Sequence, residues 1–102
     1  MENTVSWLGE EFRVLPHNAT WNPVGGVYIF AGINHRDEWN PLYVGQTHSL
    51  AERIPSHPRW LEARLLGASH VHAKVVRLEQ ERLSLERRLV GYFRPTLNRQ
   101  RR

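Results

Sequence analysis

Two short apolar runs, separated by a polar stretch, constrain the fold of this chain more than any other feature. Residues 27–31 are Val-Tyr-Ile-Phe-Ala, and β-branched and aromatic residues of this kind favour a β-strand. Residues 32–41 are polar and rich in turn formers, which predicts a loop. Residues 42–45, Leu-Tyr-Val-Gly, indicate a second strand that pairs antiparallel with the first. Side chains alternate between the faces of a strand, so Tyr28 and Phe30 share one face.

The rest of the chain alternates between helix and strand signals. Ser49 and Glu52 have capping-box spacing, which predicts a short helix that begins at Ser49 and ends before Pro55. Apolar periodicity with flanking prolines and glycines predicts the further elements: a short strand at 12–15, a helix over 58–66, a strand over 70–77 and a helix over 78–93. The main order, β-β-α-α-β-α, indicates a small α/β (α+β) domain and not a βαβ nucleotide-binding fold.

Composition excludes several classes of protein. The 102 residues include no cysteine, which excludes a disulfide scaffold, an iron–sulfur site, a Cys-ligated zinc finger and a thiol nucleophile. No apolar run approaches the ~20 residues that a membrane helix needs. The first residues lack the basic-then-apolar pattern of a signal peptide. We therefore expect one intracellular, cytoplasmic domain without membrane contact.

The net charge of +4 lies entirely at the C-terminal end of the chain. Residues 1–78 balance seven basic against seven acidic side chains, whereas residues 79–102 carry seven arginines and three glutamates. Such a basic end suits a phosphate-binding surface, and the planar guanidinium favours bidentate phosphate contacts. A solvated helix face with a basic tail is the alternative explanation of this charge. The codon usage of a GC-rich genome is the alternative explanation of the excess of arginine over lysine.

One acidic residue breaks the pattern of the last predicted helix. On a helical wheel of about 100° per residue, Glu86 falls inside the apolar arc. A mid-helix carboxylate that faces the core is costly unless a cation or a hydrogen-bond donor meets it. Glu86 is therefore either the partner of an arginine such as Arg53 or Arg82, or a metal ligand or catalytic acid/base. Arg82 falls on the same side, but in the first turn, where we expect it to be exposed.

Histidines and tryptophans offer further candidates. His70 and His72 lie on one face of a predicted strand, where they either begin a metal site or flank a substrate groove. Four aromatic side chains could stack on unpaired bases, namely Trp21, Trp39, Trp60 and Tyr92. Trp39, in the polar loop, is the strongest of these candidates, and Trp60 is expected in the core.

Taken together, these residues resemble the signature of the GIY-YIG nuclease superfamily. The matches in chain order are Gly26-Val27-Tyr28, Tyr43-Val44-Gly45, Arg53, His57, Glu86 and Pro95-Thr96-Leu97-Asn98. Arg53 follows Tyr43 by ten positions, and Asn98 follows Glu86 by twelve. The resemblance spans about residues 24–98 of a single predicted domain, with residues 1–23 as an N-terminal extension and residues 99–102 as a basic tail.

The resemblance implies a three-stranded antiparallel sheet flanked by about three helices. It also implies a metal-dependent endonuclease that hydrolyses phosphodiester bonds in DNA, with single-stranded or structured DNA as the favoured substrate. The alternative is a non-catalytic nucleic-acid-binding module that keeps the fold. We expect a standalone monomer or homodimer, or a chain that works with a partner protein. Nucleic-acid contacts are expected from Arg53, Gln46, Trp39, His72, Arg94 and Arg99.

The resemblance also implies a role for each matching residue. Glu86 would hold Mg²⁺ or Mn²⁺, hard cations that suit one carboxylate together with waters and phosphate oxygens. Tyr28 would help to take the proton from the attacking water, and Tyr43 would orient the water or the phosphate. Arg53 would stabilise the negative charge of the pentacovalent phosphate.

The remaining matches would support this chemistry. His57 would assist the base or contact phosphate. Asn98 would fix the site by hydrogen bonds, and Gly26 and Gly45 would allow close approach of the backbone. Excision-repair members often carry lysine just after the Tyr-x-Gly element, where this chain has Gln46. The general base is therefore open between Tyr28 assisted by His57 and metal-bound hydroxide.

Overall fold

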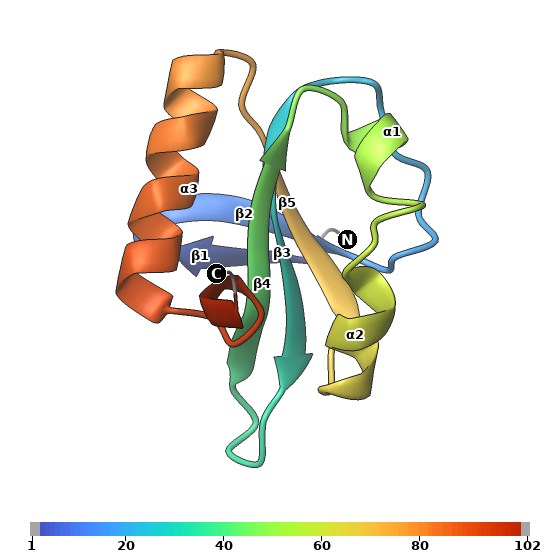
Figure 1. Cartoon of the computed structure of the whole chain (residues 1–102), viewed down its shortest axis with the longest axis vertical. Helices are drawn as coiled ribbons and strands as arrows, with labels where there is room; N and C mark the ends of the chain where they lie inside the picture. The colour runs from blue at the N-terminus through green and yellow to red at the C-terminus, as the bar shows by residue number, and fades with distance from the viewer. Residues whose placement is uncertain (1–2, 101–102) are drawn as a thin grey trace.

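The computed structural model describes residues 3–100 (Figure 1). Its elements in chain order are β1 (Thr4–Trp7), β2 (Glu10–Leu15), β3 (Gly26–Ile33), β4 (Trp39–Thr47), α1 (Leu50–Arg53), α2 (Trp60–Leu65), β5 (His70–Val75), α3 (Glu79–Phe93) and the 3-10 helix η1 (Asn98–Gln100). The predicted order of strands and helices from residue 26 onward is confirmed. Within the described residues, no helix is long and apolar enough to cross a membrane.

The sheet has five strands, not the three that the resemblance implies. Its strand order is β1-β2-β5-β3-β4, and every neighbouring pair is antiparallel. The two additional strands form an N-terminal hairpin whose turn is Leu8-Gly9, with φ values of 53° and 82°. A two-residue turn with positive φ at both positions favours Asn-Gly or Asp-Gly. Because leucine occupies the first position of this turn, the sequence does not predict the hairpin.

The pairing of β3 with β4 places the two signature tyrosines on one face of the sheet. Tyr28 lies opposite Gly45, and Phe30 lies opposite Tyr43, with a register shift directly after Phe30. The predicted antiparallel pair is therefore confirmed. β4 is longer than predicted and begins at Trp39, so the prediction that Trp39 lies in a loop is wrong.

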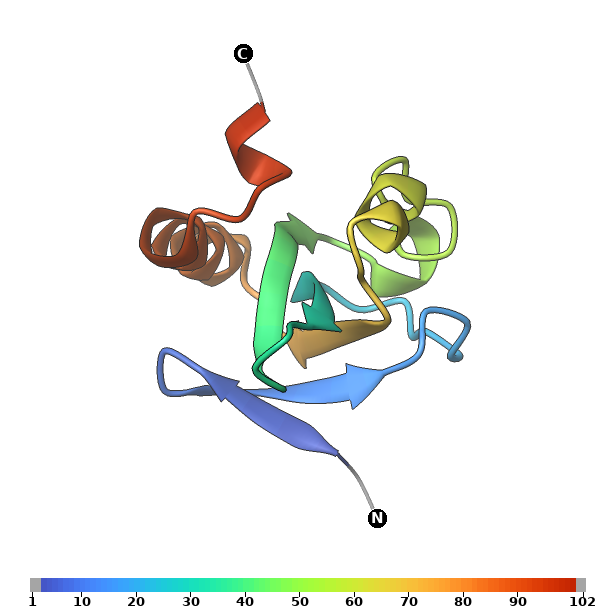
Figure 2. The same ribbon diagram turned by 90° about the horizontal axis from the view of Figure 1, so that it is seen from below.

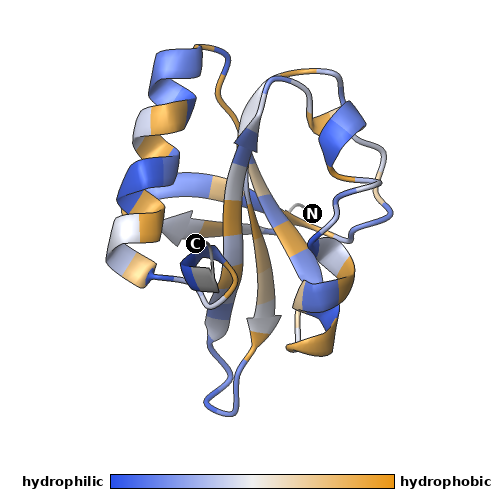
Figure 3. Cartoon of the chain, viewed as in Figure 1, coloured by the Kyte–Doolittle hydropathy of each residue, from blue (hydrophilic) through white to orange (hydrophobic). Residues whose placement is uncertain are grey.

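Each face of the sheet carries its own apolar core, and β4 stands between the helices that cover the two faces (Figure 2). On one face, Val27 and Ile29 of β3 pack against Leu85 and Leu89 of α3. Figure 3 shows the apolar residues of α3 on the side that faces the sheet. The other core, which α1 and α2 cover, contains Tyr28, Phe30, Leu42, Leu50, Ile54, Ala63 and Leu97.

The ends of the helices follow their sequence signals, with one exception at Arg82. The Ser49 side chain accepts a hydrogen bond from the Glu52 N–H and caps α1 as predicted. Arg82, in the first turn of α3, is buried, not exposed as predicted. Its guanidinium donates to the carbonyls of Val76 and Arg77, which directly follow β5. These carbonyls need a donor, and Arg82 supplies it.

Candidate active site

A glycine opposite Tyr28 makes room for the tyrosine ring. A Cβ atom at Gly45 would lie 2.5 Å from both the Oη and the Cζ atoms of Tyr28, closer than real contacts allow. The Tyr28 ring therefore lies directly against the backbone of β4. Tyr43 is next to it on the same face, with 6.4 Å between the ring centroids. The glycine that the signature places after the second tyrosine thus defines the position of the first.

His57 contacts the Tyr28 hydroxyl, and a second contact fixes its tautomer. Nε2 of His57 lies 2.8 Å from Oη of Tyr28. Nδ1 of His57 accepts a hydrogen bond of 3.0 Å from the Arg59 N–H. Since Nδ1 accepts, the proton of the neutral ring is on Nε2, which donates to Tyr28. His57 in this arrangement is a donor to the phenol oxygen and not the base that removes its proton.

The charge state of His57 agrees with this assignment. Burial lowers the pKa of His57 to about 4, and the positive charges of Arg53 and Arg59 act in the same direction. The ring is therefore neutral at pH 7. A neutral imidazole that donates through Nε2 can stabilise negative charge on the Tyr28 oxygen without titrating itself.

Arg53 and Glu86 act on Tyr28 from two different helices. Burial raises the pKa of Tyr28 above its ordinary value. The Arg53 side chain opposes this increase by hydrogen bonding and by its charge, whereas electrostatic interactions with Tyr43 and Glu86 add to it. Deprotonation of Tyr28 therefore depends on the cations that surround the ring.

Asn98 joins the C-terminal segment to the outer edge of β4. Its Oδ1 accepts from the Val44 N–H at 2.8 Å, and its Nδ2 donates to the Val44 carbonyl at 2.9 Å. The Leu97 N–H also donates to the Leu42 carbonyl at 3.0 Å. These bonds cover the edge of the strand that carries Tyr43, so the side chain of Asn98 positions the site through the backbone.

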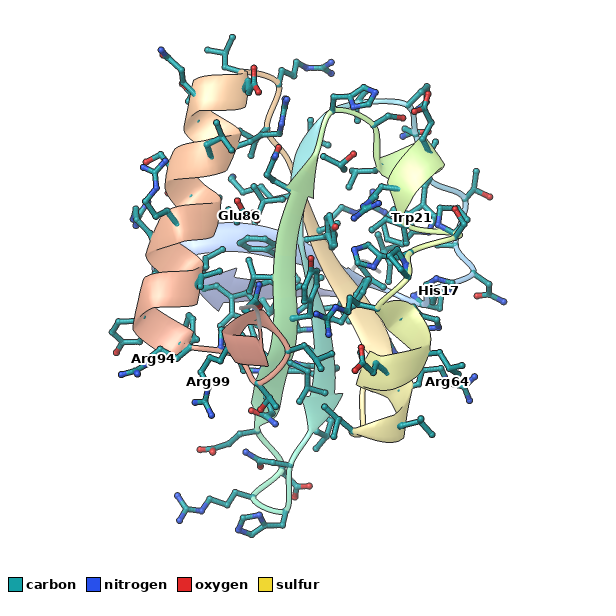
Figure 4. The ribbon with its side chains drawn as sticks, viewed as in Figure 1. His17, Trp21, Arg64, Glu86, Arg94 and Arg99 are labelled. Atoms are coloured by element: carbon teal, nitrogen blue, oxygen red, sulfur yellow. The ribbon has the colours of Figure 1, made fainter. Side chains whose placement is uncertain are left out.

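Glu86 lies between α3 and β4 and is half-buried (Figure 4). The described residues contain no group of three or more His, Cys, Asp or Glu side chains that could hold a metal ion. The single Glu86 carboxylate does not fit a structural zinc site, which has four protein ligands. It fits Mg²⁺, which is usually bound by one or two carboxylates with waters and substrate phosphates.

Two of the predicted nucleic-acid contacts, His72 and Trp39, pack against each other in the fold. His72 is completely buried, and its Nδ1 accepts from Nε1 of Trp7 at 3.0 Å. The half-buried Trp39 ring packs edge-on against His72, with 4.5 Å between centroids. Nδ1 of His70 lies 2.9 Å from Oγ of Ser69, and within the described residues the two histidines belong to no group of three or more possible metal ligands.

The other predicted contacts lie on the surface or near it. Arg53, Arg94 and Arg99 are exposed, and Figure 4 places Arg94 and Arg99 at the C-terminal end of α3 and on η1. Gln46 is half-buried, and its Oε1 accepts a hydrogen bond from Nε of Arg82. Arg101 and Arg102 of the basic tail lie outside the described residues.

Two contributors to the site were not identified from the sequence. One is the Arg59 backbone N–H, which sets the tautomer of His57 and has no side-chain signal. The other is Arg82, which links Gln46 of β4 to the end of β5. The position of Arg82 in the apolar arc of the wheel was its only available signal.

Comparison with known proteins connects this geometry to a fold. No family model matches the sequence, and no curated protein matches it. Five chains of solved structures match. One is the GIY-YIG N-terminal endonuclease domain of UvrC from Thermotoga maritima bound to its catalytic divalent cation, magnesium, with TM-score 0.60, 28% identity, and coverage of 74% of this chain and 84% of that chain. A point mutant of that domain, also bound to its catalytic divalent cation, matches with TM-score 0.61, 26% identity, and coverage of 74% and 83%. The chain therefore has a GIY-YIG-like fold.

Proposed function

We propose that this chain is a metal-dependent endonuclease that hydrolyses phosphodiester bonds in DNA. The observation that carries the proposal is the buried Tyr28 phenol, which has His57 as a donor and lies in the field of Arg53 and Glu86. The similarity to a UvrC endonuclease domain that binds a catalytic divalent cation supports it. A module that only binds nucleic acid does not need Glu86, because a carboxylate beside phosphate weakens binding.

Glu86 would hold the divalent cation, which we propose to be Mg²⁺ or Mn²⁺. When bound, the cation would supply a Lewis acid and neutralise charge on the phosphate. The carboxylate would then serve as the protein ligand, with waters and phosphate oxygens in the other positions. Arg53 would contact the same phosphate from α1, where its planar fork suits two oxygens of the pentacovalent state.

Tyr28 would orient the attacking water and accept its proton as the phenolate. The phenolate needs stabilisation because burial disfavours it, and the Nε2–H of His57 and the Arg53 guanidinium provide this. Tyr43 would hold the water or the phosphate on the same face of the sheet. His57 would thus take part as a hydrogen-bond donor, and Tyr28 would be the general base in a chain that has Gln46 where relatives often carry lysine.

The experiment is a cleavage assay on labelled single-stranded, duplex and branched DNA with Mg²⁺ or Mn²⁺. We expect strand cleavage by the wild-type chain and a loss of at least about 100-fold in Glu86→Gln. Glu81→Gln, an exposed change on the same helix, is the matched control and should cut normally. One active site cuts one strand, so nicks or cuts in single strands are the expected products of a monomer. Binding without cleavage would support the non-catalytic alternative.

A further inference from the structure

A cavity lies outside the candidate active site. It measures about 330 Å³ and lies between β2, the loop 20–24, the beginning of α1 and the end of β5. Neither tyrosine of the signature, nor His57 or Glu86, lines it. One wall comes from β2, which belongs to the N-terminal extension.

The cavity combines an aromatic wall with an apolar floor and a polar rim. Ala73 of β5 and Leu50 of α1 contribute apolar surface, and the half-buried Trp21 contributes an indole ring. Glu11 and Arg13, which are both exposed, bring an acceptor and a donor to the rim. Cavities of this size and polarity are typical of small-ligand sites.

The indole ring of Trp21 is held in place by a series of contacts. Its Nε1 donates to the His17 carbonyl at 2.9 Å. The His17 ring stacks on Trp60 at 4.3 Å with 5° between the planes, and its Nε2 lies 2.9 Å from the Ile54 carbonyl. Figure 4 shows Trp21 beside α1. A ring that is already ordered loses little entropy when a ligand stacks on it.

The cavity and the candidate active site share helix α1. Leu50 lines the cavity and Arg53 acts on Tyr28, three residues further along the same helix. Three residues correspond to about 4.5 Å along a helix axis. A nucleic-acid strand with a phosphate at Arg53 would therefore have its neighbouring nucleotides within reach of the cavity.

We propose that this cavity takes one unpaired base of the DNA strand, stacked on Trp21. The inference rests on the proposed function, whose substrate it narrows to DNA with an unpaired base beside the cut. Every base has a π face that can stack on an indole, and base edges carry both donors and acceptors. Glu11 and Arg13 line the rim of the cavity, where the edge of a bound base would lie.

The test measures binding without divalent cation, so that cleavage plays no part. The probes are a fluorescent oligothymidylate of four nucleotides and the same sugar–phosphate chain with all bases removed, which have equal charge. We expect the wild-type chain to prefer the base-containing probe about 5- to 100-fold. Trp21→Phe should keep most of this preference and Trp21→Leu should lose it. Both variants lack the hydrogen bond to His17, so they are matched for that loss.

Several outcomes would overturn the proposal. Equal binding of the two probes by the wild type is one, and a preserved preference in Trp21→Leu is another. Leu65→Ala, a change at an exposed residue of α2, should leave the preference unchanged. If Trp21→Leu does not fold, photocrosslinking of a 5-bromouracil oligonucleotide to the wild-type chain decides, because an adduct on Trp21 is expected and an adduct only elsewhere contradicts the proposal. Cleavage with no base preference would refute only the proposal that the cavity binds a base. Base preference with no cleavage would refute only the proposed nuclease function.

Discussion

Gly45→Ala tests whether the backbone of β4 positions Tyr28. The added Cβ would lie 2.5 Å from Oη and Cζ of Tyr28, against about 3.4 Å for an ordinary contact, so the ring must move by roughly 1 Å. Tyr28 is 1% exposed and packed against Phe30 and His57, so the movement cannot occur freely. Overpacking of this kind lowers the free energy of unfolding by about 1–3 kcal/mol.

The same displacement should damage the chemistry more than the fold. The 2.8 Å contact between Tyr28 and His57 would be broken, and a 1 Å misplacement can cost about 100-fold in rate. Urea unfolding measures the loss of stability, and single-turnover cleavage measures the loss of rate. Gly91→Ala in α3 is the matched control, because a Cβ there meets nothing within 4 Å. Alanine in place of a helical glycine should increase stability by about 0.5–1 kcal/mol.

A specific result would refute this reasoning. If Gly45→Ala is as stable as the wild type and its crystal structure keeps the Tyr28–His57 contact, the glycine is not what places the tyrosine. A loss of activity with an unmoved Tyr28 would also contradict the steric explanation.

Three further predictions concern the buried polar groups. Burial lowers the pKa of His72 to about 4, and His70 has a smaller effect in the same direction. In the unfolded chain the pKa of His72 returns to about 6.5, so the unfolded chain binds a proton there at a higher pH than the folded chain does. The His72 contribution to stability should be complete above pH 6.5 and fall by about 2 kcal/mol between pH 7 and pH 5. His57, whose pKa is also lowered to about 4, adds a similar dependence, so His72→Phe should remove about half of the slope in pH-dependent urea melts. Asn98→Ala should cost about 1–3 kcal/mol in thermal unfolding, because the N–H and carbonyl of Val44 lose their partners. Arg82→Met should cost a similar amount and speed hydrogen exchange at the end of β5, and unchanged exchange would contradict the capping role.

The sequence predicted the part of the fold that carries the candidate site because each element there has its own local signal. The β-branched run of β3 and the capping residue Ser49 are examples. The face shared by Tyr28 and Phe30 followed from strand alternation, and both residues lie in the same core. The placement of Glu86 on the core side of α3 followed from the helical period in the same way.

The predictions that failed depend on long-range packing. Trp39 looks like a loop residue because Pro41 and polar neighbours surround it, yet its pairing with Ile33 extends β4. The burial of His72 does not follow from the sequence, because alternation does not say which face of a strand is covered. Trp7 of the N-terminal hairpin covers that face, where its Nε1 donates to Nδ1 of His72.

The tautomer of His57 was beyond sequence reasoning for another reason. The Arg59 N–H that sets it belongs to the backbone, which has the same chemistry at nearly every position. Only the turn after Ile54 brings it to Nδ1. The assignment of His57 as a donor therefore required the three-dimensional arrangement.

The measurement that tests the central claim most directly is the single-turnover cleavage rate of labelled DNA as a function of Mg²⁺ concentration. The account predicts a saturable dependence on Mg²⁺ in the wild-type chain, and a rate at least about 100-fold lower in Glu86→Gln at every concentration. No cleavage of single-stranded, duplex or branched DNA by the wild type would contradict the account, as would equal rates in the two proteins.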